Sequence, residues 1–166
     1  MKDISGINFS SISFVLLDMD GVLSDGSIIY TSAGEQAKVF HAHDGYGIER
    51  GHQLGLTFGV ISGKKTPVNE FRVERLKISE LYQDCGDKVA AYGEIRAKYK
   101  LKQENFCFMG DDVFDLPLLG TVAFSCAPAN AIEEVKEQVH YVTVKEGGRG
   151  AVRELIDFIL RKKGLI

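Results

Sequence analysis

The chain alternates short apolar runs with amphipathic stretches. Continuous apolar runs of this length are typical of buried parallel strands. We expect them at 13–19, 56–62, 105–109 and 122–125, with shorter strands at 80–83 and 141–144. The stretches between them have helical spacing, and the predicted helices cover 44–55, 66–77, 87–100, 112–119, 129–138 and 150–163. Strand and helix follow one another throughout, which predicts the α/β class, as a Rossmann-like three-layer sandwich around a mainly parallel sheet.

One segment departs from this alternation. Residues 27–30 and 37–40 flank the polar sequence TSAGEQ, which predicts a small β-hairpin with Gly34 in its turn. The chain carries no repeat, low-complexity tract or proline-rich linker. We therefore expect a single domain over residues 1–166.

Composition and charge narrow the class of protein further. The 166 residues are 45% apolar and 26% charged, which excludes disordered and collagen-like chains. With 20 basic and 23 acidic residues the net charge is −3, so we expect no nucleic-acid and no membrane partner. The polar N-terminus is unlike a secretory signal and no apolar run is long enough to cross a bilayer, so a cytoplasmic location is expected. Cys85, Cys107 and Cys126 are expected to be reduced thiols rather than a disulfide or zinc framework.

Polar side chains gather where the predicted strands end. The residues concerned are Asp18, Asp20, Ser62, Lys88, Asp111, Asp112 and Asp115. The carboxyl ends of parallel strands meet at one edge of a sheet, where ligands bind. Each residue alone could be an ordinary turn, a helix cap or a solvated side chain. Five carboxylates together repel one another unless a cation lies among them, and an all-oxygen set favours Mg²⁺.

The spacing of Asp18 and Asp20 suits two-step phosphoryl transfer. In an extended segment, side chains two residues apart point the same way. One carboxylate can attack a phosphorus atom while the other donates a proton to the leaving oxygen. Ser62 and Lys88 can then hold the phosphoryl oxygens through a hydroxyl and an ammonium group.

Taken together, these motifs resemble the haloacid dehalogenase superfamily. Its pattern is a strand ending in D-x-D-G-[VT], then Ser or Thr, then Lys, then G-D-D-x-x-D. The chain has DMDGV at 18–22, Ser62, Lys88 and GDDVFD at 110–115, in that order. The resemblance implies a phosphatase in which Asp18 is the nucleophile and Asp20 the acid and base. It also implies Mg²⁺ bound by Asp18, the Asp20 carbonyl and Asp111, with Asp112 and Asp115 around it.

The gaps between the motifs resemble those of the capless subclass. Between Asp20 and Ser62 there is room for one hairpin and one helix, and between Ser62 and Lys88 for one helix and one short strand. Nearly the whole chain resembles the 3-deoxy-D-manno-octulosonate 8-phosphate phosphatases, through runs at 18–26, 34–48, 81–92, 110–119 and 141–155. That resemblance implies hydrolysis of a sugar acid phosphate on the way to lipopolysaccharide. It further implies a homotetramer, with the hairpin in the shared interface and the Gly-rich tail closing a neighbour's site.

The expected substrate pocket departs from that family's usual pattern. His-Ala-His-Asp-Gly at 41–45 stands where the family usually has Asn-Val-Arg-Asp-Gly, and Lys64 stands where it has Arg. A nine-carbon sugar acid 9-phosphate therefore stays open as the substrate. The predicted substrate-binding residues are His41, His43, Asp44, Gly45, Lys64, Arg72 and Arg149. Arg72 is expected two helical turns beyond Lys64 on the same face. Alternatively, Lys64 and Arg72 are solvated helix cations and His41 and His43 are ordinary polar residues. The alternative for residues 147–150 is a plain turn.

Two other classes of protein stay open at this point. One is a non-catalytic assembly module, as in a relative of nucleotidyl-sugar synthetases, and the complete set of Asp18, Asp20 and Lys88 argues against it. The other is a phosphate-accepting receiver domain. Receivers carry their paired acids early and the accepting Asp later, whereas here D-x-D comes first and the Asp pair last.

Overall fold

The computed structural model describes residues 2–34 and 36–166. Its centre is a six-stranded sheet in which every neighbouring pair is parallel. The strand order is β5 (Glu80–Tyr82), β4 (Thr57–Ile61), β1 (Phe14–Leu17), β6 (Phe106–Met109), β7 (Phe124–Ala127) and β8 (Tyr141–Val142). The chain adds β4 and β5 on one side of β1 and then returns to add β6, β7 and β8 on the other. This is the doubly wound arrangement of a Rossmann-like fold.

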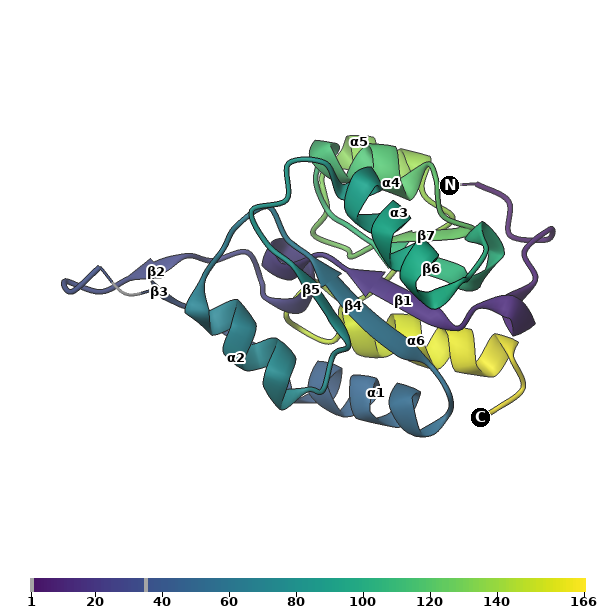
Figure 1. Cartoon of the computed structure of the whole chain (residues 1–166), viewed down its shortest axis with the longest axis horizontal. Helices are drawn as coiled ribbons and strands as arrows, with labels where there is room; N and C mark the ends of the chain where they lie inside the picture. The colour runs from purple at the N-terminus through teal and green to yellow at the C-terminus, as the bar shows by residue number, and fades with distance from the viewer. Residues whose placement is uncertain (1, 35) are drawn as a thin grey trace.

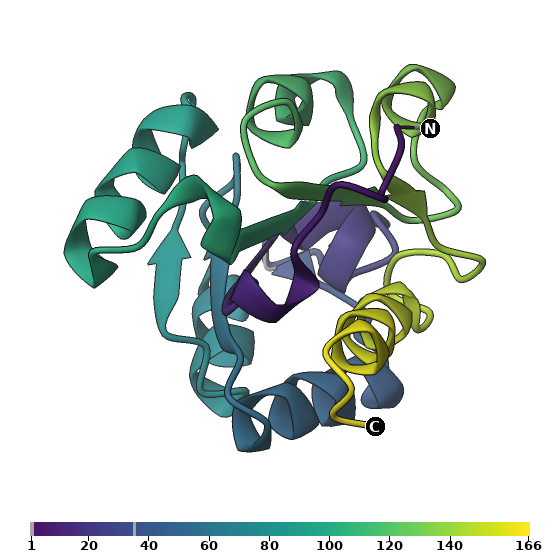
Figure 2. The same cartoon turned by 90° about the vertical axis from the view of Figure 1, so that its right-hand side faces the viewer.

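Helices cover both faces of the sheet (Figures 1 and 2). One face carries α1 (Ala42–Gln53), α2 (Pro67–Arg75) and α6 (Ala151–Lys162), and the other carries α3 (Lys88–Tyr99), α4 (Leu116–Leu119) and α5 (Glu133–Gln138). The predicted three-layer α/β sandwich is confirmed. None of the described helices is long and apolar enough to cross a membrane.

Strand β1 shows how the sequence pattern builds the two halves of the core. Val15 and Leu17 belong to the apolar cluster that includes α6, whereas Phe14 and Leu16 belong to the cluster that includes α3. All four side chains are fully buried. A strand covered on both faces has no polar side, which explains its continuous apolar run.

Several predicted elements differ in their ends. Strand β7 starts two residues later than expected, and the expected helix at 112–119 divides into a 3₁₀ turn (Val113–Asp115) and the short α4. Helix α5 starts at Glu133 rather than near 129, because Asn130 lies in a turn. Its side chain donates to the Gly21 carbonyl and accepts from the Gly147 amide. These two hydrogen bonds hold Asn130 in the turn at the sheet edge, so the helix begins later than predicted.

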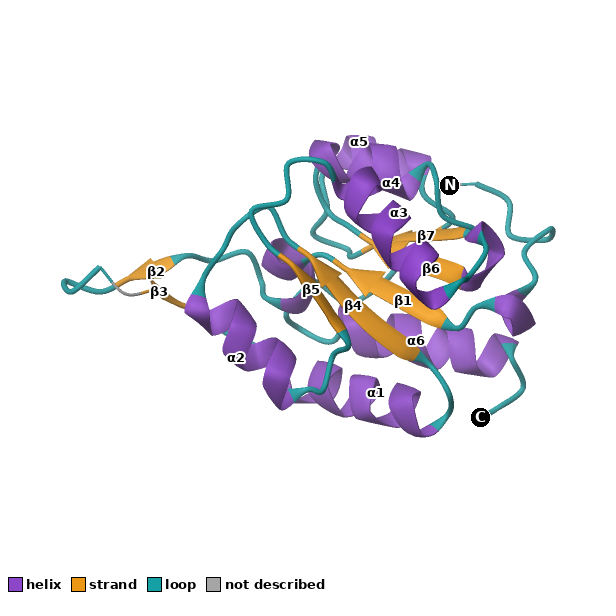
Figure 3. Ribbon diagram, in the orientation of Figure 1, coloured by secondary structure: helices purple, strands orange, loops and turns teal. Residues whose placement is uncertain are grey.

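The predicted hairpin is present but its strands are short. They are β2 (Ile29–Tyr30) and β3 (Gln36–Ala37). Gly34 lies in the turn as expected and has a positive φ there. Residue 35 of the expected turn lies outside the described residues. The hairpin projects away from the body of the molecule (Figure 3) and exposes Tyr30 at 67%. Between β1 and β4 the described chain forms a short π-helical turn (Met19–Leu23), this hairpin and α1, so no cap domain is inserted there.

Candidate active site

The acidic motifs meet where the strand order reverses. Asp18 directly follows β1 and Asp111 lies two residues beyond β6, and these two strands are neighbours in the sheet. The Asp18 amide continues the ladder by donating to the Met109 carbonyl at 3.0 Å. In doubly wound sheets this is the position where ligands bind.

A buried lysine joins two of the carboxylates. Lys88 Nζ lies 2.9 Å from Asp18 Oδ1 and 2.6 Å from Asp115 Oδ1, and all three side chains are at most 5% exposed. Lys88 is the first residue of α3, whose N-cap Asp87 accepts hydrogen bonds from Val89 and Ala90. Burial opposes the ammonium form of Lys88, but Asp18 and Asp115 together raise its pKa. The lysine therefore stays charged inside the site.

Asp18 is a weaker acid in this pocket than an exposed aspartate. Burial raises its pKa to about 6, against the attraction of Lys88 and with the help of repulsion from Asp115. Only Oδ1 of Asp18 is engaged by Lys88. A bound cation would favour the ionised form that a nucleophile needs.

Asp111 has the features of a carboxylate that binds a metal ion. Its Oδ1 is buried without a hydrogen-bond partner. Burial, followed by repulsion from Asp18, Asp115 and Asp112, raises the pKa of Asp111 to about 8. Oxygens of Asp18, Asp111 and Asp115 lie within 4.8 Å of one another. A hard divalent cation such as Mg²⁺ fits this all-oxygen donor set.

Gly21 makes this cluster possible. Its φ is +88°, and a Cβ atom at this position would lie 2.0 Å from Asp111 Oδ2. Only glycine permits both the backbone conformation and this close approach. The glycine of the D-x-D-G motif is therefore a steric requirement of the acidic cluster.

Asp112 and Asp115 support the loop that carries Asp111. Asp115 Oδ2 accepts from the amides of Asp111 and Asp112 at 2.9 and 3.3 Å, while Oδ1 binds Lys88. Asp112 Oδ1 accepts from the Val113 amide and caps the following turn. Both oxygens of Asp115 thus have protein partners, whereas Oδ1 of Asp111 has none.

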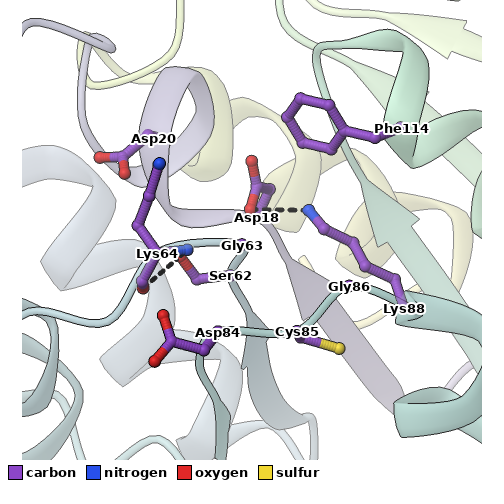
Figure 4. Close-up of a pocket in the computed structure, with 10 residues that line it drawn as sticks. All are labelled: Asp18, Asp20, Ser62, Gly63, Lys64, Asp84, Cys85, Gly86, Lys88 and Phe114. Atoms are coloured by element: carbon purple, nitrogen blue, oxygen red, sulfur yellow. Dashed lines mark hydrogen bonds and ion pairs between the residues drawn. The ribbon is translucent and has the colours of Figure 1, made fainter.

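An open cavity of about 480 Å³ lies beside these groups. Figure 4 shows Lys88 and Phe114 on one side of it and Asp20 and Lys64 on the other, with Asp18 and Ser62 between them. Ser62 directly follows β4, and its hydroxyl donates to the Lys64 carbonyl at 3.0 Å and accepts from the Lys64 amide. The structure thus brings all four predicted catalytic residues, Asp18, Asp20, Ser62 and Lys88, to one cavity.

One further residue belongs to this site although no sequence pattern predicts it. Lys38, from the hairpin arm, places Nζ 2.7 and 2.8 Å from the two carboxylate oxygens of Asp20. The same Nζ lies 2.8 Å from Oδ1 of the buried Asn69. In the sequence Lys38 is one ordinary lysine of a predicted hairpin strand, and no motif marks it.

The predicted substrate-binding residues do not form one pocket. Of these, Lys64 lines the cavity. It precedes α2 instead of sharing a helix face with Arg72, so the predicted helical spacing was wrong. Arg72 stacks on Phe40 at 4.7 Å and donates to the His41 carbonyl. With Gly45, Arg72 lines a separate depression between α1 and α2.

Asp44 is also placed differently from the prediction. Its side chain is fully buried, and its two oxygens accept from the amides of Gly150 and Arg153 at 3.1 and 2.8 Å. Burial raises the pKa of Asp44 against these hydrogen bonds. The carboxylate caps the start of α6, where unpaired amides favour negative charge. It is not open to a substrate in this chain.

The histidines and Arg149 lie in a third depression. His41 Nδ1 accepts from the His43 amide and caps α1, and the two rings are in edge contact. Arg149 forms an ion pair with Asp25 of the same chain at 3.3 Å.

The Gly-rich segment contacts its own chain. The Gly148 amide donates to the Val22 carbonyl, and a Cβ on Gly147 would lie 1.7 Å from the Gly21 carbonyl oxygen. The segment therefore supports the D-x-D-G loop of its own subunit, and its expected approach to a neighbour's site stays a prediction.

This combination of fold and site defines a haloacid dehalogenase-like hydrolase. The family of that description matches residues 61–155, and the chain belongs to it.

Individual relatives agree with this placement. The chain is 39% identical to the 3-deoxy-D-manno-octulosonate 8-phosphate phosphatase KdsC of Yersinia pestis over 91% of its length and 81% of the relative's. A crystal structure of that phosphatase from Yersinia pestis superposes with a TM-score of 0.92 at 38% identity, covering 95% of this chain and 85% of the other. A structure of the phosphatase from Moraxella catarrhalis, in complex with magnesium, phosphate and KDO, gives a TM-score of 0.91 at 33% identity and covers 94% and 90%.

Proposed function

We propose that this chain is a Mg²⁺-dependent phosphomonoesterase that hydrolyses 3-deoxy-D-manno-octulosonate 8-phosphate to the free sugar acid and phosphate. The observation that carries the proposal is the buried Asp18–Lys88–Asp115 group beside the unpartnered Asp111 oxygen. A set of three clustered acids with one lysine suits a divalent cation and an anionic phosphate together. The relatives named above supply the substrate of the proposal.

In the proposed reaction Asp18 attacks the phosphorus atom. An Asp18 Oδ–P bond forms as the P–O bond to the sugar breaks, and the leaving oxygen takes its proton from Asp20. Water then attacks the phosphorus, Asp20 takes a proton from that water, and the Asp18–phosphorus bond breaks. Ser62 and Lys88 hold the phosphoryl oxygens during both steps.

The proposed metal site consists of Asp18, the Asp20 carbonyl and Asp111. When bound there, Mg²⁺ offsets the repulsion between the Asp18 carboxylate and the phosphate. Asp112 and Asp115 keep the Asp111 loop in place through the hydrogen bonds described above.

The substrate is tested by comparing kcat/KM over a panel of sugar acid phosphates with Mg²⁺ present. We expect the eight-carbon 8-phosphate to exceed the nine-carbon 9-phosphates by at least about tenfold, a difference of about 1.4 kcal/mol in transition-state binding. Preference for a nine-carbon substrate would reject the eight-carbon assignment and keep the phosphatase. No phosphate release from any member, or from p-nitrophenyl phosphate, would favour the non-catalytic assembly module.

The proposal includes a homotetramer in the cytoplasm. The hairpin exposes Ile28, Ile29, Tyr30 and Val39 at 46–67%, and contacts between identical subunits in a closed assembly would cover them. Cys85, Cys107 and Cys126 are unpaired, as suits a reducing compartment. Light scattering tests the assembly: we expect four copies for the wild type and fewer for Tyr30→Glu. A wild-type monomer with full activity would contradict this part of the proposal.

A further inference from the structure

The side chain of Lys38 is buried although the residue belongs to the projecting hairpin arm. Its side chain is only 2% exposed, and its Nζ reaches both oxygens of Asp20 and Oδ1 of Asn69. An ammonium group loses several kcal/mol of hydration on burial unless charged and polar partners replace the water. All three of these acceptors lie within 2.8 Å. The surroundings of Lys38 Nζ therefore supply the acceptors that a buried ammonium group needs.

Asn69 gives this lysine a rigid support. The Asn69 side chain is fully buried, and its Nδ2 donates to the Lys64 carbonyl and to Gln83 Oε1, each at 3.1 Å. These bonds leave Oδ1 of Asn69 directed at Lys38. Lys38 thus links the general acid to α2 and to the segment after β5.

The Asp20 carboxyl depends on Lys38 for its orientation. Apart from Lys38, the Asp20 carboxylate accepts from the Ser24 hydroxyl at 3.1 Å, and that contact involves Oδ1 alone. Lys38 touches both oxygens and so fixes the plane of the carboxyl group. A general acid works only when its proton is aimed at the leaving oxygen, so this orientation controls the step.

We infer that Lys38 is a positioning residue for Asp20, through which the hairpin sets the strength of acid–base catalysis at the leaving group. The inference rests on the proposed function. In the first step the Asp20 O–H bond breaks and its proton joins the leaving oxygen, which keeps the electron pair of the broken P–O bond. Asp20 is then an anion, and the adjacent ammonium of Lys38 stabilises it until it takes a proton from water.

The test is the dependence of kcat on the leaving group. Nitrophenolate leaves without a proton, whereas a sugar alkoxide requires one, so an acid-specific defect shows only on alkyl phosphates. Lys38→Met is expected to lower kcat on 3-deoxy-D-manno-octulosonate 8-phosphate by about tenfold or more, within the range of acid–base contributions. On p-nitrophenyl phosphate we expect less than about threefold loss, because that leaving group uses no acid. KM should change little on either substrate.

A double-mutant cycle separates positioning from a purely structural role. In an Asp20→Asn background, Lys38→Met should have almost no further effect on kcat, because the residue it positions has lost its proton. Lys38→Arg keeps the charge and should restore part of the activity on the sugar phosphate. The matched control is Lys136→Met, which removes the same charge from an ion pair with the exposed Glu133. It should leave both rates unchanged.

The outcomes distinguish the two proposals. Equal losses on both substrates, or a full additional loss in the Asp20→Asn background, would overturn the role of Lys38 while the phosphatase stands. A wild-type protein inactive on both substrates would remove the proposed function and the inference with it. If Lys38→Met fails to fold, Lys38→Gln, which keeps a hydrogen-bond donor, takes its place. The measure is again the loss of kcat on the sugar phosphate relative to the loss on p-nitrophenyl phosphate.

Discussion

Lys88 Nζ lies 2.9 Å from Oδ1 of Asp18, a residue 70 positions earlier in the chain. The contact joins the start of α3 to the end of β1 and is buried on both sides. Lys88 therefore has two roles in the site. It neutralises part of the charge of the acidic cluster, and it lies beside the proposed nucleophile.

The first prediction concerns Lys88→Met. Removing one partner of a buried ion pair typically costs about 3–5 kcal/mol, because the remaining charges lose their compensation. We expect a lower Tm in metal-free buffer, partly restored by Mg²⁺, and a fall in kcat of about 100-fold or more, as for other lost electrostatic donors. Calorimetry and phosphate release measure the two effects. Unchanged kcat with a lowered Tm would show that Lys88 has a structural role only.

The second prediction concerns Gly147. A Cβ at this position would lie 1.7 Å from the Gly21 carbonyl oxygen, so Gly147→Ala must displace the D-x-D-G loop. We expect a lower Tm together with reduced kcat. Gly93→Ala is the matched control, since Gly93 lies on the exposed face of α3 and its Cβ would meet no atom within 4 Å. That variant should be as active as the wild type and up to about 1 kcal/mol more stable. Equal behaviour of the two variants would contradict the close packing of the Gly-rich segment.

The third prediction follows from the raised pKa of Asp111. The pKa rises from 3.8 to about 8 in the folded protein because of burial and neighbouring acids. Between these values the folded state binds more protons at Asp111 than the unfolded state. The contribution of Asp111 to the free energy of unfolding therefore falls as pH rises from about 4 to 8.

Metal-free protein should accordingly lose stability over this range, and Asp111→Asn should lose less. Because Mg²⁺ competes with protons for the site, Mg²⁺ should raise the Tm of the wild type more at pH 8 than at pH 5. Thermal unfolding with and without Mg²⁺ measures both effects. An equal pH response of wild type and Asp111→Asn would show that this carboxylate is not the group that titrates.

The fourth prediction separates Lys64 from its neighbour. Lys64 lines the cavity whereas Lys65 lines a different depression beside the hairpin. Lys64→Ala should raise KM for the sugar acid phosphate by about three- to tenfold, equivalent to roughly 0.7–1.4 kcal/mol of lost binding, with little change for p-nitrophenyl phosphate. Lys65→Ala is the control and should change neither KM. Identical effects of the two substitutions would point to general electrostatics instead of a specific contact.

The sheet and its acidic edge could be predicted because local patterns carry them. Apolar runs such as 13–19 mark strands buried on both faces, and parallel strands bring their carboxyl ends together whatever the detail of the loops. Asp18 and Asp111 lie one and two residues beyond the ends of adjacent strands, so an error of one or two residues in a strand end does not separate them.

The surroundings of the cavity could not be predicted in the same way. Asp44 looks like a polar residue near the start of a helix, but its role depends on α6, more than a hundred positions away. The predicted helix at 66–77 already begins after Lys64, and Thr66 caps the observed one, so helical spacing cannot relate Lys64 to Arg72. Lys38 reaches Asp20 only because the hairpin arm returns past the D-x-D-G loop, and spacing along the chain does not reveal this.

The most direct test of the central claim is phosphate release from 3-deoxy-D-manno-octulosonate 8-phosphate by wild type and Asp18→Asn, each with Mg²⁺ and with EDTA. The wild type with Mg²⁺ should reach a kcat/KM of about 10⁴ M⁻¹s⁻¹ or more, as is ordinary for enzymes on their own substrates. EDTA should abolish this activity, and Asp18→Asn should be inactive in both conditions with a Tm close to that of the wild type or above it. Substantial turnover by Asp18→Asn, or activity that persists in EDTA, would contradict the account.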